Sequence, residues 1–378
     1  MDIFTLANRS NEFSLRLYKL LAAQSPESNI IISPISISMA LAFLALGAGG
    51  DTKTEILQSL KFNLTKTPEA KIHQSFQLVG RLLRMTNTNL KQDLSTALFV
   101  DQQLVLKKDF QQKAQQLYSA NTTSVNFQDI TATKKLINNF VEQKTHGKIK
   151  DVVKYLDTHT RMVLVNSLFF NAKWKMPFDP NYNFNSTFYL STKKWVNVTA
   201  MRAEKKKILY FWDNRYSLNI VLLPYKDGRI SMFLILPNNG AMPKLEAELN
   251  MDLIYFWKNS MRLRLMSLYV PKLSVSRGYN LEQVLPMLGT IEFFSQVANF
   301  SGLSTARNQG LIQVVHKAVL DVAEKGTEEA PSQRKSKVPP PRLLRQTLDF
   351  SRPFMVIVFS EITNNILLLG KVVNPKQA

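Results

Sequence analysis

The chain has no cysteine among its 378 residues and only four histidines. Without cysteine there can be no disulfide framework, thiolate nucleophile, zinc ribbon or iron–sulfur site. The histidines, His73, His146, His159 and His316, are scattered and never paired at helical spacing, so we expect no metal site. The fold must therefore rest on a large apolar core, which 45% hydrophobic residues can supply.

Acidic side chains are few beside the basic ones. Forty-eight Lys and Arg against 28 Asp and Glu leave a formal charge of +20. This excess predicts attraction to a polyanion, such as nucleic acid, an anionic membrane or a sulfated glycan. Because no nucleic-acid recognition motif is visible, we expect no nucleic-acid partner.

A membrane-spanning run is also missing. The longest uncharged stretch covers residues 29–50, but Ser33 and Pro34 predict a helix start there, with a side-chain N-cap and a first-turn proline. Gly47 is a plausible C-cap. The helix of about thirteen residues between them is too short to cross a bilayer at 1.5 Å per residue. We interpret it as a helix buried in a large core, and expect no membrane span.

Hydrophobic periodicity predicts helices early in the chain and strands later. No polar linker separates the two parts, so a single intertwined α+β domain over residues 1–378 fits best. Asp227-Gly228 marks a hairpin. The predicted helices are 10–23, 52–60, 67–85, 107–118 and 131–146, with a later one at 252–260. The predicted strands are 162–170, 218–224, 230–236, 312–322, 355–359 and 365–370.

Residues 326–345 break this pattern, with four prolines, five basic residues and no apolar periodicity. The segment lies between two predicted strands, so it is an internal loop. Long structureless segments inside a compact domain are usually functional loops or disorder.

Several segments of the chain resemble the serpin family, and the similarity spans nearly all of it. The branch that it resembles is the antitrypsin-like secreted one, clade A. The segments are 29–41, 143–149, 164–180, 298–304, 315–318 with 324–328, and 349–375. The resemblance implies three β-sheets with eight or nine helices and an exposed reactive-centre loop at about 326–348, and we expect a monomer that is not an enzyme and needs no cofactor.

In inhibitory serpins a protease cleaves this loop, which then inserts into the central sheet as a new strand. Ser33, Ser36, Asn166 and His316 resemble the polar cluster over which the family's sheet opens, and Trp174 resembles the tryptophan at the top of that sheet. Such a cluster would satisfy buried polar groups where two strands separate. The alternative for each residue is an ordinary hydrogen-bonded place in the core.

The loop hinge, Glu324, Gly326, Thr327, Glu329 and Pro331, is unfavourable for insertion. Side chains of an inserted strand alternate between two faces. One set would be Thr327, Glu329, Pro331, Gln333, Lys335 and Lys337, and the other Glu328, Ala330, Ser332, Arg334, Ser336 and Val338. An unpaired buried charge costs on the order of several kcal/mol, and proline removes a ladder hydrogen bond. We therefore predict that insertion is disfavoured and slow.

The scissile bond is ambiguous. The family's spacing from Gly326 ends at Pro340, inside a triple proline, whereas counting back from Phe354 ends at Arg342. If a trypsin-like protease cuts the loop, we predict Arg342-Leu343 first and Arg345-Gln346 second.

Three functions remain open. The first is a non-inhibitory or weakly inhibitory secreted serpin that binds a polyanionic or protein partner. The second is an inhibitor of trypsin-like serine proteases with Arg342 as bait. The third is a carrier of a small hydrophobic hormone, although Phe256 and Asn364 occupy places where a steroid-carrying relative has Arg and Trp.

Basic residues cluster outside the loop as well. Lys258, Arg262, Arg264 and Lys272 resemble in location the heparin-binding helix of an inhibitory relative, so they are candidates for a heparin-like glycosaminoglycan or an acidic protein. Arg202, Lys205, Lys206 and Lys207 form another cluster. The alternative for both is a solvated face.

Six N-x-Ser/Thr sequons suit a secreted glycoprotein. They start at Asn8, Asn63, Asn121, Asn185, Asn197 and Asn299. The chain begins without a basic flank or an apolar run, so we expect no signal peptide in it and interpret it as a mature or trimmed form.

Overall fold

The computed structural model describes residues 1–85, 90–157, 159–289, 292–306, 311–327 and 346–377. Two hydrogen-bonded sheets and eight α-helices make up this part of the chain, in the α+β class that the sequence predicts. The helices are α1 (Ile3–Gln24), α2 (Pro34–Gly47), α3 (Gly50–Ser59), α4 (Glu69–Leu83), α5 (Lys108–Lys113), α6 (Ile130–Lys144), α7 (Met242–Glu248) and α8 (Met251–Ser260).

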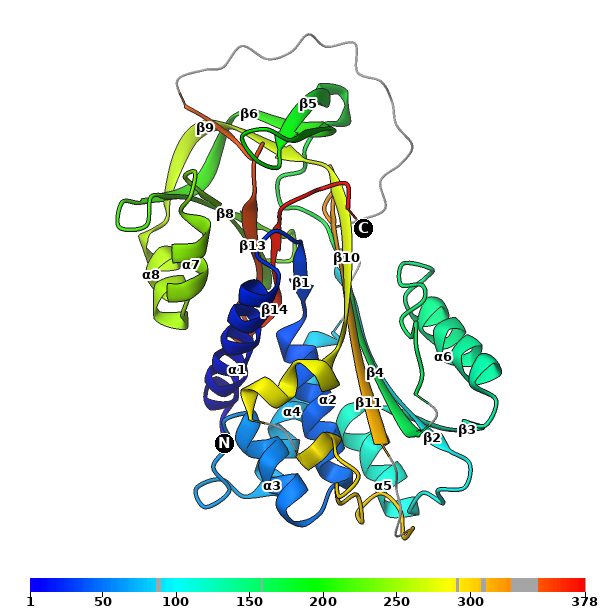
Figure 1. The fold of residues 1–378 in the computed structure, drawn as a ribbon. Helices are drawn as coiled ribbons and strands as arrows, with labels where there is room; N and C mark the ends of the chain where they lie inside the picture. Colours follow the sequence, from blue (N-terminus) through cyan, green and yellow to red (C-terminus); the bar gives the residue numbers. More distant parts are fainter. Residues whose placement is uncertain (86–89, 158, 290–291, 307–310, 328–345, 378) are drawn as a thin grey trace.

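The central sheet has five strands in the order β10-β11-β4-β2-β3. Two neighbouring pairs, β11 with β4 and β2 with β3, run parallel, while β10 with β11 and β2 with β4 are antiparallel. The strands are β2 (Leu90–Asp101), β3 (Asn121–Val125), β4 (Thr160–Ala172), β10 (Leu273–Asn280) and β11 (Leu311–Val322). Helix α6 covers one face of this sheet and α2 lies behind the other (Figure 1).

The second sheet joins nine strands in the order β1-β14-β13-β8-β7-β6-β9-β12, with β5 on β6. The strands are β1 (Ile30–Ile32), β5 (Phe184–Tyr189), β6 (Trp195–Asp213), β7 (Leu218–Pro224), β8 (Ile230–Pro237), β9 (Arg262–Pro271), β12 (Thr347–Asp349), β13 (Phe354–Ser360) and β14 (Ile366–Val372). The β6–β9 ladder shifts register between Ala203 and Lys206. Both β6 and β9 continue through this bulge, so two of the three expected sheets form one continuous sheet.

Helix α2 is buried over almost its whole length, as its apolar sequence predicts. Ser33 does occupy the N-cap position, but the prediction of a side-chain cap is wrong because its hydroxyl makes no capping hydrogen bond. The helix ends at Gly47, and the C-cap residue is Ala48, one position later than predicted.

The other predicted elements are confirmed with small shifts of their ends, except that the first helix, predicted from residue 10, begins at Ile3. The helix expected at 107–118 is divided: α5 ends at Lys113 and a π-helical turn continues over Ala114–Tyr118. The hairpin at Asp227-Gly228 joins β7 to β8, and the last two strands pair as predicted. Eight strands were not predicted from the sequence: β1, β2, β3, β5, β6, β9, β10 and β12. In β2 and β6, polar residues hide the alternation.

Candidate functional site

A polar cluster bridges the two parallel strands at the centre of the five-stranded sheet. His316 on β11 and Asn166 on β4 are register partners. The His316 ring hydrogen-bonds through Nδ1 to Asn166 Oδ1 at 2.8 Å, and its Nε2 accepts the Ser33 backbone N–H at 3.0 Å. Since Nε2 accepts, the ring proton lies on Nδ1. One imidazole therefore ties β11 both to β4 and to the start of α2.

Ser36 and Thr96 complete the cluster. Ser36 Oγ donates to Asn166 Oδ1 at 2.7 Å, and Asn166 Nδ2 donates to Thr96 Oγ1 at 3.2 Å. The amide of Asn166 thus connects α2, β4, β2 and β11. Four of the five predicted residues, Ser33, Ser36, Asn166 and His316, are brought together here.

The cluster is fully buried, and this decides its charge state. His316, Asn166, Ser33 and Ser36 each have 0% exposed surface. Burial lowers the pKa of His316 to about 3, so the ring is neutral at physiological pH. A neutral ring is what the hydrogen bonds require, because a protonated one has no acceptor for the Ser33 N–H.

Trp174 lies apart from the cluster, just beyond the end of β4. Its indole Nε1 donates to the carbonyl of Ala323 at 2.9 Å, and its ring stacks on Tyr225 with centroids 4.4 Å apart. The Trp174 backbone N–H also bonds the Lys325 carbonyl at 2.8 Å. Trp174 therefore fastens the chain leaving β11 to the end of β4, which is the point where the loop begins.

The described part of the hinge is tightly held. Glu324 is 3% exposed and accepts hydrogen bonds from Asn183 Nδ2 at 2.5 Å and from Lys272 Nζ at 2.9 Å. Burial raises the pKa of this carboxyl, but the hydrogen bonds outweigh burial and hold the pKa below its ordinary value. Glu324 is thus a buried anchor for the end of β11.

Gly326 and Thr327 join the hinge to β4. A Cβ on Gly326 would lie 1.9 Å from the Ala172 carbonyl oxygen, and its φ of +148° suits glycine, so no other residue fits without movement. Thr327 N–H donates to Ala172 O at 2.9 Å, and Thr327 Oγ1 accepts the Ala172 N–H at 2.8 Å. The Thr327 side chain is 1% exposed. The start of the loop is therefore already paired with a central strand.

The remaining loop predictions fall mostly on residues that the structure does not describe. Glu329, Pro331, Arg342, Leu343 and Arg345 lie outside the described residues. Gln346 is described and exposed, and its carbonyl accepts the Ser267 N–H at 2.9 Å.

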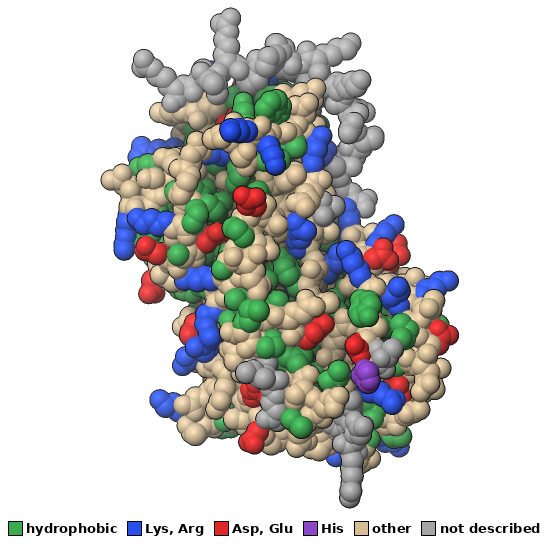
Figure 2. Space-filling model, in the orientation of Figure 1, with side chains coloured by type: hydrophobic (Ala, Val, Ile, Leu, Met, Phe, Trp, Pro, Cys, Tyr) green, Lys and Arg blue, Asp and Glu red, His purple; other side chains and the backbone are tan. Residues whose placement is uncertain are grey.

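The predicted glycan-binding residues do not form one cluster. Arg262 begins β9 and Lys272 follows its last residue, so the two lie about 30 Å apart at the usual rise of a strand. Lys258 pairs with Glu361, and Lys272 pairs with Glu324 at 2.9 Å. Arg262 donates to the carbonyls of Asn259 and Met261 at 3.1 and 2.8 Å. Figure 2 shows Lys and Arg side chains spread widely over one face of the molecule.

All six sequon asparagines are exposed, although they belong to different elements. Asn8 is on α1, Asn121 begins β3, Asn185 is on β5 and Asn197 is on β6. An exposed side chain is the minimum requirement for attachment of a glycan.

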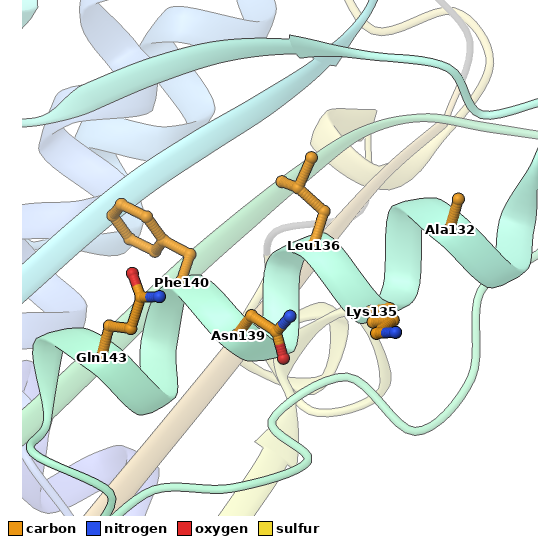
Figure 3. Close-up of a pocket in the computed structure, with 6 residues that line it drawn as sticks. All are labelled: Ala132, Lys135, Leu136, Asn139, Phe140 and Gln143. Atoms are coloured by element: carbon orange, nitrogen blue, oxygen red, sulfur yellow. The ribbon is translucent and has the colours of Figure 1, made fainter.

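A groove of about 450 Å³ runs along the outer side of α6 (Figure 3). Its described lining comes from that helix alone: Ala132, Lys135, Leu136, Asn139, Phe140 and Gln143. Phe140 packs edge-on against Phe99 of β2, with ring centroids 5.6 Å apart. Only Phe140 links this groove to the packing of α6 on the central sheet.

The residues weighed for hormone binding have ordinary packing roles. Phe256 on α8 packs edge-on against Phe211 at 5.6 Å and is 53% exposed. Asn364 has a φ of +54° in the turn between β13 and β14, and its carbonyl accepts from Asn11 Nδ2 at 2.7 Å.

Sequence reasoning missed Thr96, Asn183 and Tyr225. A lone hydroxyl, amide or aromatic residue gives no pattern of its own, and only the spatial partner reveals its role. Among the described residues, no group of three or more His, Asp or Glu could hold a metal ion, and no helix is long and apolar enough to cross a bilayer.

The fold and the cluster define an α+β protein whose central sheet holds a buried polar cluster at the boundary between its parallel strands β11 and β4. The chain belongs to the serpin family: a profile of the family, described as serpin (serine protease inhibitor), matches residues 8–375. This confirms the resemblance seen in the sequence.

The chain is similar to relatives within the family at 32–46% identity. The chain is 46% identical to alpha-1-antichymotrypsin of Pongo abelii over 380 residues, covering 99% of this chain and 89% of that protein. It is similar in structure to human glycosylated kallistatin, with a TM-score of 0.93, 35% identity and coverage of 99% and 98%. It also resembles human thyroxine-binding globulin in complex with its hormone, with a TM-score of 0.92, 32% identity and coverage of 99% and 100%.

Proposed function

We propose that this protein is an extracellular serpin whose loop does not insert readily into the central sheet, so that it acts by binding a partner instead of trapping a protease. The observation that carries this proposal is the buried side chain of Thr327, paired with Ala172 on β4. The buried Thr327 side chain determines which of the two alternating sets of loop side chains would be buried if the loop inserted as a strand.

The alternation of a strand extends that choice along the loop. With Thr327 buried, a continuing strand would turn Glu329, Pro331, Gln333, Lys335 and Lys337 to the same side. Three of these five carry charge. Each unpaired charge buried there costs on the order of several kcal/mol, and Pro331 removes a ladder hydrogen bond from an interior strand.

Opening the sheet has its own cost. A strand entering between β11 and β4 must separate His316 from Asn166, which are hydrogen-bonded at 2.8 Å across that boundary. Both groups have 0% exposed surface, so each needs a new buried partner. An apolar loop strand would offset this cost by burying its side chains, but insertion of this loop would bury charged side chains instead.

A second candidate function is inhibition of a trypsin-like serine protease with Arg342 as bait. The hydrogen-bonded cluster of His316, Asn166 and Ser36 favours it, because the polar residues over which the family's central sheet opens are complete in this chain. The name of the similar alpha-1-antichymotrypsin points the same way.

A titration with trypsin separates the two candidates. We expect a denaturing gel to show cleaved chain and no covalent complex, with mass spectrometry placing cuts at Arg342-Leu343 and Arg345-Gln346. A covalent complex formed by the natural chain would overturn the proposal in favour of the inhibitor.

Two loop variants test the physical reason. Replacing Glu329, Pro331, Lys335 and Lys337 with alanine removes the obstacles from the buried side and should produce some covalent complex. The matched control replaces Glu328 and Arg334, which belong to the outward set, and should leave the outcome unchanged.

The six exposed sequons support an extracellular location, and the charge of +20 supports an acidic partner. Secretion from cultured animal cells behind a leader, followed by a mobility shift on enzymatic deglycosylation, tests the first point. Salt-dependent elution from heparin tests the second.

A further inference from the structure

An unusual surface lies where β6 and β9 pair beside α8, at the left-hand edge of the molecule in Figure 1. We call it the β6–β9 corner and define it as Lys205, Lys206, Lys207, Leu263, Arg264 and Leu265. All six residues are exposed, and the two leucines expose 62% and 57% of their surface. Leucine and cation therefore alternate in a small area.

The strand register places these side chains relative to one another. Leu263 is opposite Leu209, and Leu265 is opposite Lys207, so these four share one face of the ladder. Arg264 lies opposite Ile208, so the exposed side chains of Arg264 and Lys206 belong to the other face and flank the same edge. The bulge at Lys205, with a φ of +48°, lets three consecutive lysines remain exposed. Farther along β6, Phe211 meets the half-exposed Phe256 of α8 and extends the apolar side of the corner.

The lysine and arginine side chains of the corner have no ion-pair partner among the described residues. Across the described ranges, no ion pair joins Lys205, Lys206, Lys207 or Arg264 to an acidic side chain, whereas nearby Arg202 pairs with Glu204 at 3.3 Å. Figure 2 shows Lys and Arg side chains at this left-hand edge, with hydrophobic and acidic side chains near them. The unpaired charge is available to a partner.

The leucines sit on a strand edge. In the part of the chain that is described, β12 pairs with β9 only over Ser267–Tyr269, which leaves the outer side of residues 262–266 without a neighbouring strand. Exposed leucines on an open edge favour aggregation, and natural proteins usually replace or cover them. A patch of this kind, rimmed by charge, marks an interaction surface.

We propose that the β6–β9 corner docks on the surface of an anionic phospholipid bilayer. A sulfated glycan would pair with the cations but gain nothing from two protruding leucines. A bilayer surface uses both, because the leucine tips enter the boundary between headgroups and acyl chains while lysine and arginine bind the anionic headgroups. This inference names the acidic partner of the proposed function, and it does not depend on whether the loop inserts.

Co-sedimentation with vesicles tests the proposal. We expect the full chain to bind vesicles of phosphatidylcholine containing phosphatidylserine, more weakly at high salt, and not to bind phosphatidylcholine alone. The Leu263→Ser/Leu265→Ser variant should lose about tenfold or more in partitioning. Changing Lys205, Lys206 and Lys207 to glutamine should lose about fivefold for each charge removed.

Matched controls alter the same residue types elsewhere. Leu78→Ser/Leu136→Ser, and glutamine at Lys66, Lys108 and Lys135, should bind vesicles as the natural chain does. A heparin column run in parallel identifies a glycan site: the leucine variant should elute as the natural chain does. Vesicle binding that is absent, or that survives the leucine changes, would overturn the proposal, whatever the trypsin gel shows.

Discussion

His316 hydrogen-bonds through Nδ1 to Asn166 Oδ1 at 2.8 Å, across the boundary between the parallel strands β11 and β4. The same ring accepts the backbone N–H of Ser33 through Nε2. The neutral imidazole therefore joins two strands and a helix at the boundary between β11 and β4. We call these two hydrogen bonds the His316 clasp. Any process that opens this boundary must break the clasp.

The His316 clasp predicts how the free energy of unfolding depends on pH. Burial lowers the pKa of His316 from 6.5 to about 3 in the folded protein. Between these values the unfolded chain takes up a proton that the folded chain does not, so stability is complete above pH 6.5 and falls as the pH is lowered towards 3. The slope from this group reaches about 1.4 kcal/mol per pH unit.

Urea unfolding of the His316→Gln variant over the same pH range tests this. The variant should be less stable at pH 7 but show a flatter pH profile. His159→Gln, which changes an exposed histidine, should keep the profile of the natural chain. An unchanged profile in the His316 variant would show that the clasp does not titrate in this way.

Gly326 should tolerate no side chain. A Cβ there would lie 1.9 Å from Ala172 O, so Gly326→Ala must displace the hinge, at a cost on the order of 2 kcal/mol. Gly228→Ala is the control, because its φ of +72° is also unfavourable but no atom lies within 4 Å. Thermal unfolding should show the larger loss at Gly326, and equal losses would argue against the close contact.

The Thr327 hydroxyl should be required for the full stability of the folded chain. Thr327→Val keeps the shape but leaves the Ala172 N–H without its acceptor, at a cost of about 1–3 kcal/mol. Thr327→Ser retains the oxygen and should cost much less. Chemical denaturation of the two variants measures the difference, and equal effects would mean that packing alone holds the hinge.

Lys371 forms a buried ion pair with Glu246 at 2.9 Å, and the lysine is completely buried. Tyr18 OH also donates to Glu246 at 2.8 Å, which joins α1 and α7 to β14. Removing one partner leaves an unpaired buried charge, so Lys371→Met should cost about 3–5 kcal/mol. The double variant with Glu246→Gln should recover much of that loss in urea unfolding; no recovery would show that the charges are not coupled.

Much of the fold follows from local patterns. The apolar residues of α2, the Asp227-Gly228 turn and the last two strands each specify their structure within a few positions. The resemblance to serpins located Ser36, Asn166 and His316 because the family's landmarks surround them. Local information was sufficient wherever the decisive neighbours are close in sequence.

The remainder depends on distant partners. The Ser33 hydroxyl was expected to cap α2, but the backbone N–H of Ser33 is directed to His316, 283 positions away. Lys272 was expected to face a glycan, but it pairs with Glu324 beside Asn183. The bulge in β6 interrupts its alternation, so the exposed lysines and the leucines opposite them show no pattern in sequence. Such relationships arise only when the strands are in register.

The measurement that tests the central claim most directly is the melting temperature of the chain before and after cleavage at Arg342-Leu343. If the charged, proline-containing loop does not insert, the cleaved chain should melt within about 2 °C of the intact one, the shift that roughly 1 kcal/mol produces in a large domain. A large rise after cleavage would mean that the loop has become a strand between β11 and β4, and would contradict the account.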